Sequence, residues 1–524
     1  MASDHLFRLI QSLSKNEKVY IKRSASLHRI GGKNKYIKFF DLLCRMKEYD
    51  ERVILKKFAG DPFFNNISAA KNYLLNYILH VLESYHQSAY SEIRSCLHQV
   101  EILEDKGLID LCRKKIARAE HLAVKYQWVE QLFSIYSWKY HLYPEGLKKD
   151  DYLDYMTALG DKIQESISDL KEYADVKSEF YKGVAKALYL DPRGLEMNRQ
   201  VVLAEIARVE TRDPETFHSF YAKYNYLLLL RILYSSIGKH TESLRYVNQM
   251  HELFLGSPHM IGLELYNFLF NLREKMYYEV QSGQSEKILH SFRMLDELCT
   301  EYGAHKKIVW LLLHNMKFSL CIRFGEFQSA RRHAAESQKV FRKIESSEIY
   351  AEEQKFFLIR SAVLYLGLED YRESLKYINE ALEISAHEMI GDLNYFAQIF
   401  QLIIYYEKGE SELIEYRSRA VYRTLLRRKR KFHAEKVLVD FFRRELDEDE
   451  PQSKIPAFKA LKSTLADVFE THPEEKVVLR FFDIMDWIQC KIEKLSLPEL
   501  LYKKNTKLLE TDAGKKLLTY LKEE

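Results

Sequence analysis

Six of the eighteen glycines in this chain recur at nearly regular intervals. The separations are 87, 44, 45, 42 and 84 residues, and the positions are Gly107, Gly194, Gly238, Gly283, Gly325 and Gly409. These separations are one or two steps of about 43 residues, and the two skipped steps fall at Asp150 and Glu369. A fixed period in this range is typical of stacked helical arrays, in which each unit contacts only its neighbours. The spacing therefore predicts an α-solenoid.

The segments that follow these positions also resemble one another. An apolar or aromatic residue two positions after the turn is followed, three positions later, by a small one, as at Cys112, Ala330 and Ser374. Apolar residues then continue at helical spacing. A glycine at the end of a helix accepts a positive φ, and a small residue lets two helix backbones approach. We therefore expect each unit to be a hairpin of two helices.

Composition agrees with an all-α fold. The chain has 18 glycines and 9 prolines in 524 residues, which leaves few positions for the turns that bound strands. The first residues carry charge throughout and lack the apolar core of a signal peptide. The longest apolar stretch, around Tyr224 to Tyr234, is far shorter than a membrane span, and the six cysteines are scattered without a CxxC pair. These features predict a cytoplasmic protein with no membrane segment.

The chain divides into three predicted regions. Residues 1–92 do not follow the repeat and are expected to form a small helical module, with a capping box at Ser14 and Glu17 and a long helix over 67–85. Residues 93–446 contain the repeats. Residues 447–524 begin with an acidic break, include a second capping box at Ser496 and Glu499, and are expected to form a helical cap with a polar outer face.

One unit carries a recognisable motif. The stretch AVLYLGLEDYRESLKYINEALEIS, residues 362–385, resembles the second half of a tetratricopeptide repeat, with Tyr371, Ser374, Ile378, Ala381 and Leu382 on the positions typical of that motif. The period is longer than in that family, and most units lack its small residue in the first helix. The chain is thus similar to degenerate, long-helix repeats of bacterial regulatory solenoids and of uncharacterised bacterial proteins.

The resemblance implies where a ligand would bind. In tetratricopeptide arrays the first helices line the concave face, and residues ten and thirteen positions before the turn glycine point into the groove. The polar residues at these positions here are Asn225, Arg273 and Asn315. Asn can bond a peptide backbone, and Arg can hold a carboxylate with two bonds. Other residues in this register are apolar (Leu228, Phe270, Leu312 and Phe356), so packing of this face as core is the alternative.

Two basic features could contact an anionic partner or nucleic acid. Residues 1–75 contain 15 Lys and Arg against 7 Asp and Glu, and a helix in this region is expected to expose Lys71 beside several asparagines. The alternative is a solvated cap. The second feature is a basic run, Arg427, Arg428, Lys429, Arg430 and Lys431, which either docks an acidic partner or lies in solvent at a hairpin end.

No enzyme motif is found. The segment GGKNK at 31–35 lacks the spacing of a phosphate-binding loop, and His387 and Glu388 lack the second histidine of a zinc-protease helix. No catalytic residue, cofactor or metal is predicted. The sequence favours a non-enzymatic scaffold that binds a protein or peptide on its concave face. The alternative is a nucleic-acid-binding regulator, with the N-terminal module as reader and the solenoid as sensor.

Overall fold

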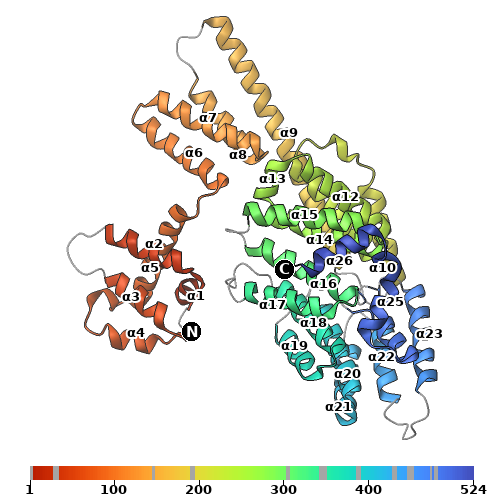
Figure 1. Cartoon of the computed structure of the whole chain (residues 1–524). Coiled ribbons are helices and arrows are strands. Elements are labelled where there is room, and N and C mark those ends of the chain that lie inside the picture. Colours follow the sequence, from red (N-terminus) through yellow and green to blue (C-terminus); the bar gives the residue numbers. More distant parts are fainter. Residues whose placement is uncertain are drawn as a thin grey trace. The chain divides into compact units, whose positions relative to one another are not determined.

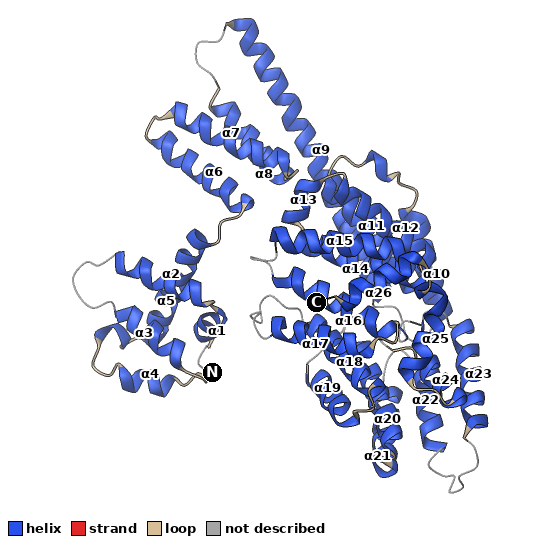
Figure 2. Cartoon of the chain, in the orientation of Figure 1, coloured by secondary structure: helices blue, strands red, loops and turns tan. Residues whose placement is uncertain are grey.

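The computed structural model describes residues 4–27, 35–143, 148–188, 195–302, 307–341, 351–384, 391–427, 433–444, 454–472, 475–476, 479 and 482–523. In these residues every regular element is a helix, as the composition predicts (Figure 2). The all-α fold class is therefore confirmed.

The chain forms two compact units, and the division falls between Ile167 and Ser168, inside one long helix. The helices up to that division are α1 (His5–Ser12), α2 (Lys15–Leu27), α3 (Lys35–Arg45), α4 (Glu51–Lys57), the short 3₁₀ helix η1 (Pro62–Phe64), α5 (Ile67–Tyr85), α6 (Ala89–Asp105), α7 (Ile109–Lys125), α8 (Val129–His141) and the first half of α9 (Lys149–Leu188).

The second unit holds the rest of α9 and the helices that follow it, coloured from yellow to blue in Figure 1. They are α10 (Leu195–Val209), η2 (Pro214–Thr216), α11 (Phe220–Ser236), α12 (His240–Leu255), α13 (Pro258–Leu263), α14 (Leu265–Gln281), α15 (Ser285–Tyr302), α16 (Lys307–Arg323), α17 (Phe327–Phe341), α18 (Ala351–Gly367), α19 (Tyr371–Glu383), α20 (Gly391–Lys408), α21 (Ser411–Arg427), α22 (His433–Arg444), α23 (Ile455–Thr471), α24 (Ile484–Glu493), α25 (Leu497–Leu509) and α26 (Asp512–Lys522).

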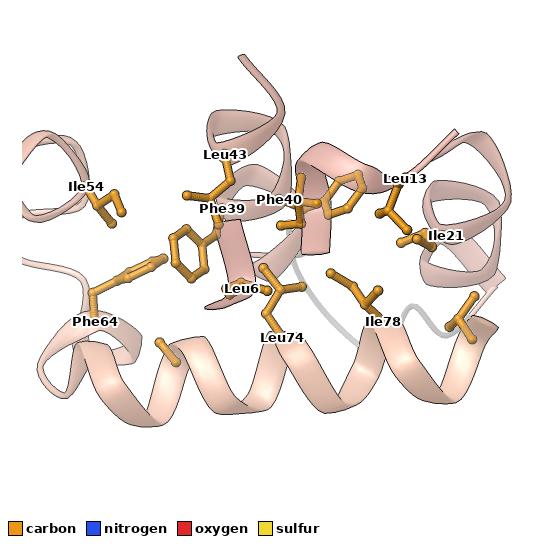
Figure 3. Packing of buried hydrophobic residues seen from close by; sticks show 13 residues of the cluster. Leu6, Leu13, Ile21, Phe39, Phe40, Leu43, Ile54, Phe64, Leu74 and Ile78 are labelled. Carbon is orange, nitrogen blue, oxygen red and sulfur yellow. The ribbon is translucent and has the colours of Figure 1, made fainter. Parts of the chain in front are cut away.

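The N-terminal helices α1–α5 surround a core of their own. Helix α5 begins and ends where the sequence predicts, and the Asn66 side chain caps it by accepting from the amide of Ala69 at 3.1 Å. Its apolar face carries Leu74 and Ile78, which point toward Leu6 and the rings of Phe39 and Phe40 in Figure 3. A second apolar cluster joins α6–α9.

Both predicted capping boxes are confirmed. The amide of Ser14 donates to the Glu17 carboxylate at 2.7 Å, and the amide of Glu17 donates back to the Ser14 hydroxyl at 3.2 Å. Ser496 and Glu499 make the same reciprocal pair at the start of α25. Each box satisfies amides that have no partner inside the helix.

The hairpin turns have the backbone conformation that the glycines predict. In Gly107, Gly238, Gly283, Gly325 and Gly409, φ lies between +67° and +78°, and at the skipped step Glu369 takes φ +60° without being glycine. Gly194 lies outside the described residues. The other skipped step is not a hairpin turn, because Asp150 lies in the first turn of α9. An acidic residue is favoured there by the amides of a helix N-terminus.

A hydrogen bond recurs inside three of these hairpins. The small residue of the second helix donates to the carbonyl twelve positions earlier on the first helix: Cys112 Sγ to Val100 at 3.6 Å, Ser243 Oγ to Arg231 at 3.3 Å, and Ser374 Oγ to Ala362 at 2.7 Å. All three donors are fully buried. The small residue thus both permits close packing and bonds the paired helix.

Helices of the second unit pack on the next helix, and some of them also pack on the next but one. Examples are α11 on α12, α12 on α14, α14 on α15 and α16, and α16 on α17 and α18. The C-terminal helices depart from this order, since α25 packs on α16 and α26 packs on α15 and α16. The end of the chain therefore covers hairpins that lie far earlier in the sequence.

Candidate functional site

Two of the three predicted groove residues line one small cavity. Arg273 of α14 and Asn315 of α16 both border it, with Glu353 of α18 at its edge. The remaining lining is apolar or aromatic and consists of Tyr266, Leu269, Phe270, Ile308, Leu311 and Leu312. The volume is about 20 Å³, room for roughly one water molecule. Three successive first helices of the hairpins thus contribute to a single site.

An ion pair closes this cavity. The guanidinium of Arg273 bonds the carboxylate of Glu353, across α16, and the two side chains are 16% and 12% exposed. Burial lowers the pKa of Arg273, but the neighbouring Glu353 and Glu274 outweigh it and the pKa is raised. The arginine is therefore charged and already holds a carboxylate of its own chain.

Arginine and phenylalanine side chains alternate on either side of the cavity. The Arg231 guanidinium lies 5.2 Å from the centroid of Phe270, and Arg273 lies 4.8 Å from Phe270 and 6.0 Å from Phe356. Arg360 follows at 5.9 Å from Phe356. We call these five residues the Arg–Phe row. Contacts of this kind contribute about 0.5 to 2 kcal/mol each, and here they hold three cations along α11, α14 and α18.

The amide of Asn315 leaves a polar atom unsatisfied. The residue is 3% exposed, and its Oδ1 atom has no hydrogen-bond partner among the described residues. A buried acceptor without a donor costs about 1 to 3 kcal/mol. An N–H group or a water molecule entering the cavity would remove that cost.

The third predicted groove residue does not border this cavity. The Asn225 amide of α11 donates to the carbonyl of Tyr221, one turn earlier on its own helix, at 2.7 Å. One of its polar atoms is thus already bonded within its own helix.

The basic candidates have different outcomes. The prediction that Lys71 is exposed is wrong: its side chain is 12% exposed, and its ammonium bonds Glu51 at 2.7 Å and the Tyr49 hydroxyl at 3.1 Å. Burial lowers the pKa of Lys71, but these two bonds outweigh it and the pKa is raised. In the basic run, Arg427 ends α21, whereas Arg428, Lys429, Arg430 and Lys431 lie outside the described residues, as does the side chain of Arg427.

A histidine and carboxylate cluster lies at the start of α22. The possible ligand atoms of His433, His472 and Glu475 are within 4.8 Å of one another. Glu475 is 1% exposed, and its carboxylate accepts from the amides of His433 and Ala434 at 2.9 and 2.8 Å. The two imidazole planes are nearly parallel, with centroids 4.3 Å apart, so their in-plane lone pairs do not converge on a metal. The cluster is best explained as a cap that neutralises the helix N-terminus.

Most of the cysteines are buried, and none of them forms a disulfide. Cys44 is half-buried, the other five are buried, and all six are free thiols. Burial raises the pKa of Cys299, Cys321 and Cys490 to about 12. A thiol with so high a pKa is a poor nucleophile.

No protein-family model matches this chain, and a search of curated proteins finds no matching sequence. In the part of the chain that the structure describes, no helix has the length and apolar character needed to cross a bilayer.

Glu353 is the functional candidate that the sequence did not indicate. It lies two hairpins after Arg273, 80 residues along the chain, and no local motif indicates that these two residues form an ion pair. The sequence does place Phe270 and Phe356 in the same register of the repeat. Each stands thirteen positions before a turn, at Gly283 and Glu369, and these turns are two repeat steps apart. Their register indicates one face of the array, but not the cations between them.

Proposed function

We propose that this protein is a non-enzymatic interaction scaffold, a degenerate tetratricopeptide-like solenoid of about 43-residue hairpins that holds a partner protein or peptide on its first-helix face. Three observations support the repeat: the left-handed turns, the recurring hydrogen bond over twelve residues, and the packing of the first helices α14, α16 and α18 on one another in succession. Such arrays bind extended ligands along the surface that successive units share.

The cavity between Arg273, Asn315 and Glu353 is the observation on which the proposal rests. An acidic side chain of a partner would replace Glu353 on the Arg273 guanidinium, and a backbone N–H would satisfy Asn315 Oδ1. The exposed parts of the Arg–Phe row would hold neighbouring acidic and aromatic residues. The ligand chemistry favoured here is therefore a peptide in which acidic and aromatic residues alternate.

The alternative, a nucleic-acid-binding regulator, loses one of its contacts. Lys71 was the phosphate contact of that hypothesis, and its ammonium is bonded to Glu51 and Tyr49 inside the module. A phosphate at this position would have to displace both partners.

A double substitution tests the peptide site without leaving a buried charge. Arg273→Met with Glu353→Met removes both members of the ion pair, and replacing a buried pair by apolar residues is often neutral for stability. We expect a labelled peptide of alternating Glu and Phe to bind the wild-type chain and to lose at least tenfold in affinity for the variant. That loss corresponds to about 1.4 kcal/mol.

The matched control is Lys139→Met with Glu120→Met, an ion pair of 2.8 Å on α8 and α7. It should leave the affinity unchanged. Two results would reject the site. One is that the Glu–Phe peptide binds the Arg273→Met, Glu353→Met variant as tightly as the wild type; the other is that the wild type binds a Lys–Phe peptide more tightly than the Glu–Phe peptide.

A further inference from the structure

The last two helices, α25 and α26, form a clamp over the middle hairpins of the second unit. The amide of Asn505 donates to the carbonyl of Arg323, at the end of α16, at 2.9 Å. The Tyr520 hydroxyl donates to Asp296 of α15 at 2.8 Å, and the Lys522 ammonium bonds Glu326 at 2.8 Å. We call residues 497–522 the C-terminal clamp.

Ionisable groups lie directly under α26. The Lys317 ammonium is 4.1 Å from the centroid of the Tyr520 ring, and the side chain of Lys317 is 9% exposed. The Nε2 atom of His333 is 2.8 Å from the carbonyl of Leu521, which requires a proton on that nitrogen. The rings of His314 and His333 are 6.0 Å apart. Lys317 and His333 therefore contact α26 directly, and the half-buried His314 lies beside His333.

Three carboxylates near this space, those of Asp296, Glu326 and Glu336, already have partners. The Asp296 carboxylate accepts from Tyr520, and that of Glu326 is paired with Lys522. Other ionisable groups face Lys317, His314 and His333 from every helix that meets there. Helices α15 and α16 contribute Asp296, Cys299 and Cys321, and the turn after α16 contributes Glu326. Helix α17 contributes Arg332, Glu336 and Lys339, and the end of the chain contributes Tyr520, Lys522 and Glu523. Protonating either histidine would place a second cation close to Lys317.

Burial makes both histidines reluctant to accept that proton. Burial, followed by the nearby His333 and Lys317, lowers the pKa of His314 from 6.5 to about 4. Burial also lowers the pKa of His333, although its bond to Leu521 opposes the shift. A lowered pKa in the docked state means that the docked state binds fewer protons. The stabilisation is thus complete above about pH 6.5 and is lost as the pH falls toward 4.

We propose that the C-terminal clamp is an acid-sensitive device: neutral His314 and His333 keep α26 docked on α15–α17, and their protonation beside Lys317 releases it. The released surface is the one on α15 and α16 that α26 now covers. The inference is independent of the peptide site, which lies on other residues of α16.

Hydrogen exchange measured by mass spectrometry on the full chain at pH 7 and pH 5 tests the device, after correction for the intrinsic exchange rate. The pKa of His314 is about 4 when α26 is docked and 6.5 in a free histidine. If release restores the free value, lowering the pH from 7 to 5 increases the equilibrium constant for opening of the clamp about 20-fold. We expect residues 512–522 to lose protection by that factor or more. Helix α19, which contains no histidine, should lose much less.

Two variants assign the effect to these histidines. His314→Gln with His333→Gln keeps a donor toward Leu521 but cannot become charged, so it should abolish the acid-specific loss in 512–522. The control His251→Gln removes a histidine of similar burial, whose pKa is also lowered to about 4, from α12 and should leave that loss intact.

The outcomes decide the proposal in either direction. The proposal is overturned if the double variant retains the wild-type pH dependence, or if 512–522 and α19 respond equally in the wild type. If the double variant does not fold, the comparison of 512–522 with α19 in the wild type and in His251→Gln still decides.

Discussion

The hairpins α6–α7 and α16–α17 share a turn but not an environment. Gly107 and Gly325 have φ values of +71° and +78°, and the small residues five positions later, Cys112 and Ala330, are both fully buried. A Cβ atom added at Gly107 would meet nothing within 4 Å. At Gly325 it would overlap the carbonyl oxygen of Pro498 and lie 2.8 Å from the amide nitrogen of Tyr502.

The difference shows that glycine has one role in the first turn and two in the second. At Gly107 it supplies the left-handed conformation that closes a hairpin. At Gly325 it also lets the backbone of α25 approach, so that the C-terminal clamp can dock. A local repeat therefore predicts the turn but not the element that covers it.

The largest expected effect comes from adding one methyl group to each turn. Gly325→Ala should destabilise the protein by about 2 to 5 kcal/mol, because left-handed strain of roughly 1 to 2 kcal/mol adds to the overlap with α25. Gly107→Ala should cost only the strain. Chemical denaturation of both variants measures the difference, and equal losses would show that α25 does not rest on the turn.

Whether the sequence predicts a feature of this structure depends on how far apart in the chain the interacting residues lie. Both capping boxes, the bounds of α5 and five of the six glycine turns follow from residues a few positions apart and are confirmed, whereas the repeat step at Asp150 is not a turn. The ion pair between Arg273 and Glu353 joins residues 80 apart, and the bond between Asn505 and Arg323 joins residues 182 apart. No local pattern encodes such distances, so the closed cavity and the clamp were not predicted.

An intermediate effect is expected from removing one hydroxyl under the clamp. Tyr520→Phe leaves the Asp296 carboxylate without its donor and should cost about 1 to 3 kcal/mol. In the first unit, Tyr155→Phe removes a hydroxyl that lies 3.4 Å from the carbonyl of Lys139 and should cost under about 0.5 kcal/mol. Thermal melting of the two variants compares them, and similar shifts would contradict the importance of the Tyr520 bond.

The smallest expected effect concerns the hydrogen bond that recurs inside the hairpins. Ser374→Ala removes the donor to the Ala362 carbonyl, a bond of 2.7 Å, and should destabilise by about 1 kcal/mol. Cys112→Ala removes a longer bond, 3.6 Å from a weak thiol donor, and should change stability less through hydrogen bonding. Urea denaturation curves would measure both, and a greater loss in Cys112→Ala would indicate that packing, not the bond, decides.

The central claim is that the end of the chain rests on the turn at Gly325. Hydrogen exchange of residues 497–522 in Gly325→Ala and in Gly107→Ala, both at pH 7, tests it most directly. We predict faster exchange in the clamp of Gly325→Ala and wild-type exchange in the clamp of Gly107→Ala. Unchanged exchange of residues 497–522 in Gly325→Ala would contradict the account.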